Sequence, residues 1–251
     1  FTLLDRGEKR LVKRLHGEVS EAKLRAALER EFDDVTLATM LYAYAEQPLT
    51  QLLEIVSGLP EAQRQRLRNA YIGDRKTRRD RPYRALEAGY PYTFDLVTDF
   101  GTYKDLMRHR MTTQLRQRFS PRLGFVMPPD LEAAGFGEKA KACHERAAGL
   151  YDRLAEEFPD EASYATLHGN KVRWLLGMNE REAYHLLELR TTPQGHPSYR
   201  KASQQMHRLI EQRSPWRAAA MKFVDHAEYH WARGDSEAKQ RVKERRLDHG
   251  N

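Results

Sequence analysis

Three basic side chains stand next to one another at Arg108, His109 and Arg110. Two guanidinium groups and an imidazole within one turn of chain cannot all point away from one another, so at least one of them needs a partner. An anionic ligand such as a phosphate would supply that partner. The alternative is a basic helix end whose charges are satisfied by the last carbonyl groups of the helix and by water. The spacing alone leaves both interpretations open.

A second group of polar side chains lies in residues 179–196 and consists of Asn179, Arg181, His185, Glu188, Arg190 and His196. In a helix that starts after Asn179 as N-cap, the helical period places Arg181, His185 and Glu188 on one face. His185, Glu188 and His196 are metal-ligating types, but their spacing matches no zinc motif, and we expect no metal there. A row of Asn, Arg and His is better suited to pyrophosphate, ribose and ring edges.

Apolar periodicity indicates the elements that must hold these side chains. The clearest strand is residues 90–97, rich in aromatic and β-branched residues, and a second is expected at 124–127. Residues 73–81 are polar and mostly basic, as in a loop or a ligand-facing segment. Helices are predicted at residues 8–28, 34–57, 61–71, 99–111, 137–158, 161–176, 180–189 and 199–212. The sequence predicts an α+β fold: a helix-rich domain (61–251) around a small antiparallel-type sheet, with a helical segment (1–60) packed on it.

Composition supports a globular, cytoplasmic protein. The chain has 251 residues, of which 40% are hydrophobic and 31% charged, a balance that supports a core rather than disorder. The N-terminus lacks the apolar core of a signal peptide, and no apolar run approaches the roughly 18 residues that a membrane span needs. The single cysteine, Cys143, cannot form an internal disulfide and has no flanking nucleophile motif, so we interpret it as an ordinary helix position.

The net charge of +7 raises the question of nucleic-acid binding. The excess lies mainly in residues 64–84, 108–122 and 239–246, and none of these segments holds a Gly-aromatic RNA-binding signature. The last is expected to be a solvated helix, and the other two could equally bind a small phosphorylated ligand. We therefore expect no nucleic-acid partner.

Residues 94–111, which end in Arg108-His109-Arg110, resemble the strand-helix-"RHR" signature of the flavin-dependent thymidylate synthases. Residues 179–196 resemble the family's C-terminal signature, in which Asn-x-Arg, a His or Asn four residues on, Leu-Arg and a later His follow in this order. The resemblance spans roughly residues 78–210. It implies that the chain binds FAD and acts on a uracil nucleotide related to dUMP.

The resemblance also implies roles for single residues. Arg108, His109 and Arg110 would contact the flavin and its phosphates, and the flavin site would be completed from a neighbouring segment or subunit by Asn179, Arg181, His185 and His196. Glu87 lies in a segment that resembles the family's flavin-contacting Pro-x-Glu-His turn, with a longer spacing. Arg190 matches the arginine that orients the uracil nucleotide, and we assign it to the catalytic group.

The chain departs from the family on the nucleotide side. Leu115 and Arg116 stand where the family has Asn-Glu, Asp105 replaces a glutamine, and Ser163 replaces an arginine. The interval 190–196 is two residues longer than usual. This pattern resembles the C-terminal copy of tandem members with two such domains in one chain, and the start at Phe1 is consistent with an excised or processed domain.

A two-residue insertion would let Ser120 and Arg122 imitate the family's Ser-x-Arg, so both join Arg190 as expected catalytic residues. The implied reaction methylates dUMP to dTMP, with reduced FAD as hydride donor, methylenetetrahydrofolate as carbon donor and NADPH as reductant. The alternatives are a flavin-binding domain with another nucleotide substrate and a non-catalytic partner half of a tandem enzyme. Either a homo-oligomer or pairing with a sister domain is expected.

Overall fold

The computed structural model describes residues 2–4, 21–82, 84–88, 92–229, 234, 237–242 and 244. The chain divides into two compact units, each made of segments distant in sequence. The first unit comprises Phe1–Arg25 and Tyr90–Asn179, and the second comprises Ala26–Gly89 and Glu180–Asn251. The segment expected at residues 1–60 stays a prediction, since residues 5–20 lie outside the described part.

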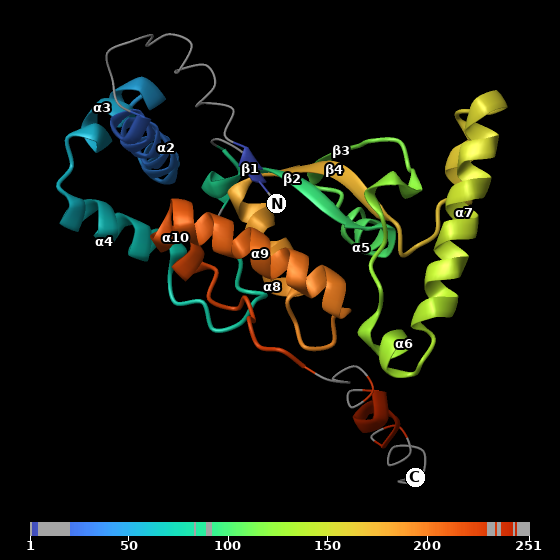
Figure 1. The fold of residues 1–251 in the computed structure, drawn as a ribbon. Helices are drawn as coiled ribbons and strands as arrows, with labels where there is room; N and C mark the ends of the chain where they lie inside the picture. Colours follow the sequence, from blue (N-terminus) through green and yellow to red (C-terminus); the bar gives the residue numbers. More distant parts are fainter. Residues whose placement is uncertain are drawn as a thin grey trace. The chain divides into compact units, whose positions relative to one another are not determined.

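A four-stranded antiparallel sheet forms the centre of the first unit, in the order β1-β2-β4-β3 (Figure 1). Its strands are β1 (Thr2–Leu4), β2 (Tyr92–Asp99), β3 (Thr112–Arg116) and β4 (Lys171–Met178). The strand predicted at 90–97 is confirmed as β2, and the predicted α+β class is confirmed. The strand expected at 124–127 is wrong, because that segment contributes only an isolated bridge between Phe125 and Asn170.

The helix predicted at 161–176 is also wrong. The structure has a short 3₁₀ turn, η3 (Glu161–Ala165), followed by strand β4. Buried and half-buried residues alternate without exception along β4, which is the period of a strand with one face on a core. The apolar pair Leu175-Leu176 spans both faces, so the local sequence fits either period.

The buried face of the sheet holds the core of this unit, with Phe94, Leu96, Trp174 and Leu176 fully or almost fully buried. Helix α5 (Phe100–Leu106) packs on it, and the ring of Tyr103 meets that of Trp174 edge-on at 5.1 Å. Asp99 caps α5, since its Oδ1 accepts from Thr102 N at 2.8 Å. Because α5 ends at Leu106, the helix predicted at 99–111 is shorter than expected.

The first unit also contains helices outside the sheet. Helices α6 (Pro129–Ala133) and α7 (Gly137–Glu157) follow the 3₁₀ turn η2 (Pro121–Leu123). Tyr151 of α7 forms a small separate core with Ala162 and Ala165 of η3. The helix predicted at 137–158 is confirmed as α7, on which Cys143 is exposed and unpaired.

The second unit is built of helices in its described residues. They are α2 (Glu21–Tyr42), α3 (Leu49–Ser57), α4 (Glu61–Ile72), α8 (Glu180–Arg190), α9 (Pro197–Arg213) and α10 (Pro215–Ala220), with the 3₁₀ turn η1 (Arg84–Glu87). The helices predicted at 61–71, 180–189 and 199–212 are confirmed. The continuous helix predicted at 34–57 is wrong, because the first helix ends at Tyr42 and the next begins at Leu49, after Pro48, which has no N–H to donate.

Three further predicted segments, a loop and two helices, can be compared with the structure over their described residues. Residues 73–81 form a loop, as predicted. Residues 8–20 of the first predicted helix lie outside the described part, whereas 21–28 belong to α2. In the tail, 239–242 and 244 are helical and exposed, and its other residues lie outside the described part.

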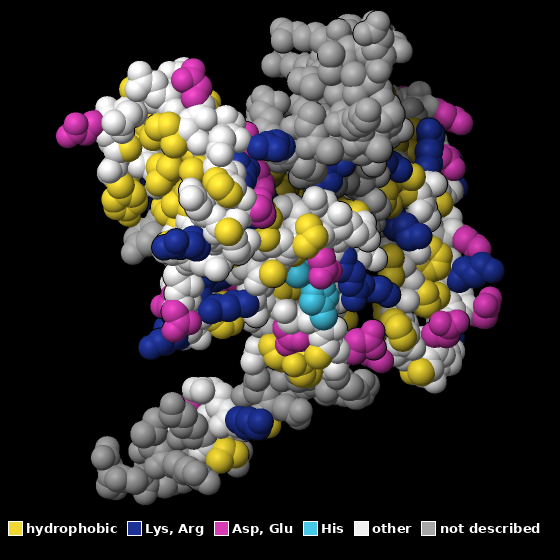
Figure 2. Space-filling view, turned by 90° about the vertical axis from the view of Figure 1, so that its left-hand side faces the viewer, with side chains coloured by type: hydrophobic (Ala, Val, Ile, Leu, Met, Phe, Trp, Pro, Cys, Tyr) yellow, Lys and Arg dark blue, Asp and Glu magenta, His cyan; other side chains and the backbone are white. Residues whose placement is uncertain are grey.

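Two surface properties bear on partners. Among the described helices, none combines the length and the apolar character that a membrane crossing needs. On the face shown in Figure 2, Lys and Arg side chains of the described residues are interspersed with Asp and Glu rather than gathered into one surface. A continuous basic surface of the kind that attracts a nucleic-acid backbone is not seen among the described residues of this face.

Candidate functional site

The Arg108-His109-Arg110 segment is a tight turn between α5 and β3. His109 is buried, with 6% of its surface exposed, whereas Arg108 and Arg110 are exposed on either side of it. The backbone of His109 is fixed, because its N–H donates to Leu106 O at 3.1 Å and its carbonyl accepts from Thr112 Oγ1 at 2.5 Å. The guanidinium groups of Arg108 and Arg110 thus face solvent from a turn whose backbone is fixed by hydrogen bonds.

The sheet register brings this turn next to Asn179. Strands β3 and β4 are antiparallel neighbours, and Thr112 pairs with Met178. The residue before β3 and the residue after β4 are therefore neighbours at one end of the sheet. Met111, next to Arg110, and Asn179 hold these positions. The first predicted motif and the first residue of the second are brought together in this way, although they are distant in sequence.

A pocket of about 270 Å³ lies at this end of the sheet. It is lined by Thr93, Met111, Thr113, Leu115, Leu175, Gly177, Met178 and Asn179. Gly177 forms part of its floor, and a Cβ added there would lie 3.5 Å from Thr113 Cβ, an ordinary contact. A larger side chain at this position would fill the pocket from the floor.

The lining combines apolar walls with a few polar groups. Met111, Leu115 and Leu175 supply apolar surface, two threonine hydroxyls and the Asn179 amide supply hydrogen-bonding groups, and two arginines stand in the adjoining turn. Such a lining suits a flat heterocycle with phosphate attached. Sequence reasoning missed Leu175 and Gly177, because β4 was not predicted as a strand; once a strand is assigned, its alternation places them on one face. It also missed Thr93, although strand β2 was predicted.

In the second unit, Arg181 on α8 meets Glu87. Its Nη1 donates to Glu87 Oε1 at 2.6 Å and its Nε donates to Pro82 O at 3.0 Å. His185 lies one helical turn further on and is half-buried. Two of the predicted flavin contacts, Arg181 and Glu87, are therefore neighbours, and a partly exposed ion pair of this kind can rearrange toward an anionic ligand.

Glu188, predicted on one helix face with Arg181 and His185, is more deeply buried than either of them. It is 1% exposed, and both carboxylate oxygens accept from Arg75, at 2.6 and 2.5 Å. Burial raises the pKa of Glu188, and Arg75 opposes that rise. The Arg75 guanidinium also lies 4.9 Å from the Tyr184 ring. Glu188 therefore holds the basic loop in place and cannot be part of an open ligand set.

Arg190 and His196 flank the loop between α8 and α9. The guanidinium carbon of Arg190 lies 5.2 Å from the Tyr199 ring centre. His196 is exposed, and its Nδ1 accepts from Ser198 N at 3.3 Å as the N-cap of α9. A Cβ on Gly195 would approach the side chains of Arg200 and Tyr199 to 2.8 Å, so glycine lets this longer loop fold against α9.

Ser120 and Arg122 lie elsewhere in the first unit. Ser120 precedes η2, and the guanidinium carbon of Arg122 lies 5.8 Å from the ring of Tyr151 on α7. Neither residue lines the pocket. Their role in holding a nucleotide stays a prediction.

Comparisons with known proteins agree with the motifs. The chain is 32% identical over 232 residues to a UPF0159 protein of Chlamydia muridarum, covering 90% of this chain and 44% of the relative. A UPF0159 protein of Thermoplasma acidophilum is 29% identical over 217 residues, covering 86% of this chain and 43% of the relative. The chain thus spans less than half the length of these curated relatives.

A solved structure shares the fold: the UMP/dUMP methylase PolB from Streptomyces cacaoi, with a TM-score of 0.59 and 17% identity over 76% of this chain and 90% of that one. The sequence model of the family described as thymidylate synthase complementing protein matches residues 34–216, most of the chain. The resemblance drawn from the two motifs is confirmed, and the chain belongs to the thymidylate synthase complementing protein family.

Proposed function

We propose that this protein binds FAD and methylates a uracil nucleotide of the dUMP type. The observation that carries the proposal is the register Thr112–Met178, which places the Arg108–Arg110 turn and Asn179 beside one pocket. The first motif and the first residue of the second, identified separately in the sequence, thus lie at one pocket. The solved structure that shares the fold is a UMP/dUMP methylase bound with 5-bromo-dUMP, which supports this substrate class.

The residues present fit a flavin. The pocket offers an apolar floor that Gly177 leaves open, and the adjoining turn offers the exposed arginines Arg108 and Arg110 for a pyrophosphate. Arg181, with Glu87 beside it, and the nearby His185 would complete the flavin contacts, as would Asn179 and His196. Bound FAD would supply the hydride chemistry that no side chain of the protein provides.

The protein's own groups would bind and orient the substrates. Arg190, Arg122 and Ser120 would hold the nucleotide phosphate and stabilise negative charge on the uracil ring. Methylenetetrahydrofolate as carbon donor and NADPH as reductant are parts of the same proposal. Because the relatives are more than twice as long as this chain, we also propose that the site works in a homo-oligomer or beside a sister domain.

One observation favours a second candidate, a flavin enzyme with another nucleotide substrate. Leu115, which stands where the family has a polar residue, lines the pocket and is 60% exposed. An apolar side chain there cannot hydrogen-bond a uracil edge. A ligand with an apolar substituent on that edge would instead be favoured.

The visible spectrum of the purified protein after incubation with FAD tests the proposal. We expect bound flavin, and we expect the variant with Arg108→Ala and Arg181→Ala to lose it, because each charge-assisted hydrogen bond contributes about 1.5–3 kcal/mol. The control is Arg146→Ala, which removes an exposed arginine from α7. Flavin content equal to that of the wild type in the double variant would refute the assignment.

Gly177→Val probes the pocket itself. Valine suits a strand, and the backbone of Gly177 has no positive φ, so the fold should tolerate the change. The added methyl groups would occupy the pocket floor, and flavin or nucleotide affinity should fall. Normal affinity for both ligands would show that the pocket is not the site.

A further inference from the structure

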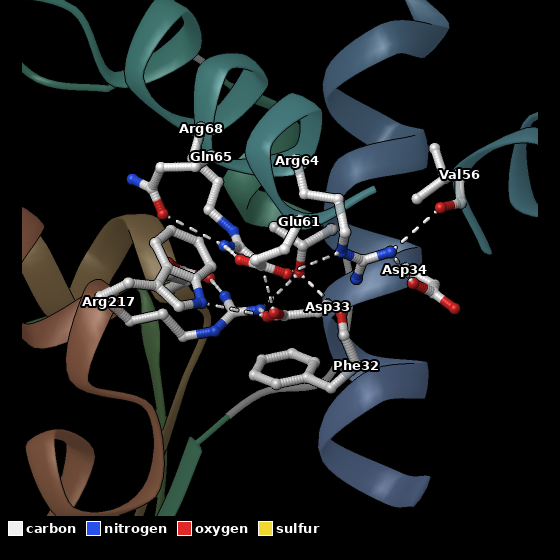
Figure 3. Close-up of polar contacts among 12 residues, drawn as sticks. Phe32, Asp33, Asp34, Val56, Glu61, Arg64, Gln65, Arg68 and Arg217 are labelled. Carbon is white, nitrogen blue, oxygen red and sulfur yellow. Dashed lines mark hydrogen bonds and ion pairs between the residues drawn. The ribbon is translucent and has the colours of Figure 1, made fainter. Parts of the chain in front are cut away.

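Arg217 of α10 is completely buried, and its contacts reach two other helices. Figure 3 shows Arg217 beside Asp33 and Phe32 of α2. The Nη1 of Arg217 donates to Glu180 Oε2 on α8. Its Nη2 donates to Asp33 Oδ1 and to Thr36 Oγ1 of α2, both at 2.9 Å. The guanidinium carbon also lies 3.9 Å from the centre of the Phe32 ring. Arg217 therefore bridges a carboxylate at the start of α8 to one on α2.

Asp33 does not depend on Arg217 for partners. It also accepts from Arg68 Nη2 at 2.7 Å and from Trp216 Nε1 at 3.2 Å. A second pair, Arg64 and Asp34 at 2.6 Å, joins α4 to α2 without touching α8. The α2–α4–α10 group is thus held by several contacts, and the one between Arg217 and Glu180 links it to α8.

Glu180 faces inward at an unusual place. It is the first residue of α8, where a glutamate ordinarily faces solvent near the free amides of the helix end. Here its side chain is 4% exposed, and its Oε1 accepts no hydrogen bond from the described residues. Burial raises the pKa of Glu180, with Arg217 opposing the rise. The buried position of the Glu180 carboxylate therefore depends on Arg217.

The direction of Arg181 follows from that of Glu180. Successive helical residues are about 100° apart around the axis, since a turn has roughly 3.6 residues. With Glu180 fixed inward, Arg181 is directed to the side, where it meets Glu87 and Pro82 O. Glu182 and Ala183 are also buried in the first turn, but Glu180 is the residue there whose side chain is paired with Arg217.

We propose that Arg217 is a positioning residue, which fixes the first turn of α8 through Glu180 and thereby aims Arg181 at its ligand. The inference rests on the proposed function, in which Arg181 contacts the flavin. Asp33 and Arg217 lie one residue outside the segment 34–216 that matches the family. The aim of a family motif residue thus depends on a contact formed outside the matched segment.

A positioning role differs measurably from a stabilising one. Replacing both members of a buried ion pair by neutral side chains of similar size often leaves stability unchanged, whereas removing one member leaves a buried charge unpaired. The variant with Glu180→Gln and Arg217→Met removes the pair as a whole, and Asp33 keeps Arg68 and Trp216. The matched control, Arg64→Met with Asp34→Asn, removes another largely buried pair, which joins α4 to α2.

The experiment measures the melting temperature and the FAD dissociation constant of both double variants. We expect similar melting temperatures. The Glu180/Arg217 variant should bind FAD roughly 10-fold to 100-fold more weakly, the loss typical when a residue that orients a binding group is removed. The control should bind as the wild type does. Wild-type affinity in both double variants would overturn the positioning role.

Two further measurements keep the test decisive. If the double variant does not fold, the variant Arg217→Lys is tested in its place. A lysine can reach only one of the two carboxylates, so we expect the folded variant to bind FAD more weakly, and unchanged FAD binding would overturn the positioning role of Arg217. If the wild type binds no FAD, the proposed function fails, and amide hydrogen exchange in the first turn of α8 decides instead. Faster exchange in the Glu180/Arg217 variant than in the control supports the positioning, and equal exchange overturns it.

Discussion

Arg75 and Glu188 form a two-pronged ion pair in the interior of the helical unit, with N–O distances of 2.6 and 2.5 Å. The pair joins the basic loop at 73–81 to α8. Arg75 also donates to Asp80 O at 2.6 Å and to Ala220 O at 3.1 Å. Arg75 thus anchors the loop, whereas the other basic side chains of the loop face solvent.

Arg75→Met should destabilise the protein by about 3–5 kcal/mol, because it leaves the Glu188 carboxylate buried without a cation. The midpoint and slope of urea unfolding measure this change. Arg79→Met in the same loop is the control, since Arg79 is exposed, and a change within about 0.5 kcal/mol is expected. Equal effects of the two substitutions would show that the anchor contributes little.

Glu188 should also make stability depend on pH. Burial raises its pKa above the ordinary value of 4.5, so the folded state holds this proton more tightly than the unfolded state does. The stabilising contribution is therefore complete below pH 4.5 and is lost as the pH rises through the folded-state pKa. We expect Glu188→Gln to make the unfolding free energy fall less steeply with pH above 4.5. An unchanged slope in urea unfolding across that range would contradict the assignment.

A histidine pair predicts the opposite pH dependence. His226 Nε2 lies 3.0 Å from His207 Nδ1, and His207 Nε2 lies 3.1 Å from Ala218 O, to which it must donate. Burial lowers the pKa of His226, and the nearby His207 and Arg208 lower it further. The carboxylates of Glu211 and Asp225 oppose this by raising it. The stability from this pair is present above pH 6.5, the ordinary value, and is lost as the pH falls through the lowered pKa.

We therefore expect acidification below pH 6.5 to loosen residues 225–229, which α9 holds through Gln204 and Arg200. Hydrogen exchange of these amides at pH 7.5 and 5.5, corrected for intrinsic rates, measures the effect. His226→Gln should remove most of the pH dependence, because glutamine can still donate to His207 Nδ1 but does not titrate. A variant that retains the full dependence would place the titrating group elsewhere.

How much of the fold the sequence predicts depends on the kind of element. Amphipathic helices such as α7 and α9 follow from local periodicity alone. Strand β4 does not, because its central residues Trp174, Leu175 and Leu176 form a continuous apolar run that fits either period. Only its neighbours β2 and β3 decide in favour of a strand. The break before Pro48 was detectable, since proline restricts the residue before it.

The residues of the site also differ in whether the sequence alone identifies them. Arg108, Asn179 and Arg181 were identified from motifs, because short patterns of residue types survive in a single sequence. Glu180 and Arg217 were not, because their pairing depends on how distant segments pack, and any of the chain's many arginines could have been the partner. Alternation along β4 would have identified the pocket floor at Gly177 once a strand was assigned.

Strand β3 lacks the Asn-Glu pair of the family and has Leu115 and Arg116 in its place. Leu115 and Arg116 are consecutive residues of β3, so their side chains lie on opposite faces of the sheet. Leu115 lines the pocket, whereas the guanidinium carbon of Arg116 lies 4.3 Å from the Phe119 ring. Of the two positions, only Leu115 should therefore change the affinity for dUMP when the family's residue is restored. Leu115→Asn should tighten dUMP binding roughly fivefold, the effect of one hydrogen bond worth about 1 kcal/mol, and Arg116→Glu should not.

Titration of the flavin-loaded protein with dUMP, followed by the flavin spectrum, measures both variants. In the wild type we expect oxygen to reoxidise the reduced flavin far faster than dUMP with methylenetetrahydrofolate does, because Leu115 and Ser163 each replace a polar family residue on the nucleotide side. Anaerobic release of tritium from C5 of the nucleotide provides the decisive rate. Fast turnover in the wild type that Leu115→Asn does not change would contradict this expectation. Arg190, with Ser120 and Arg122, would then suffice to hold the nucleotide, and the apolar pocket wall would not hinder the reaction.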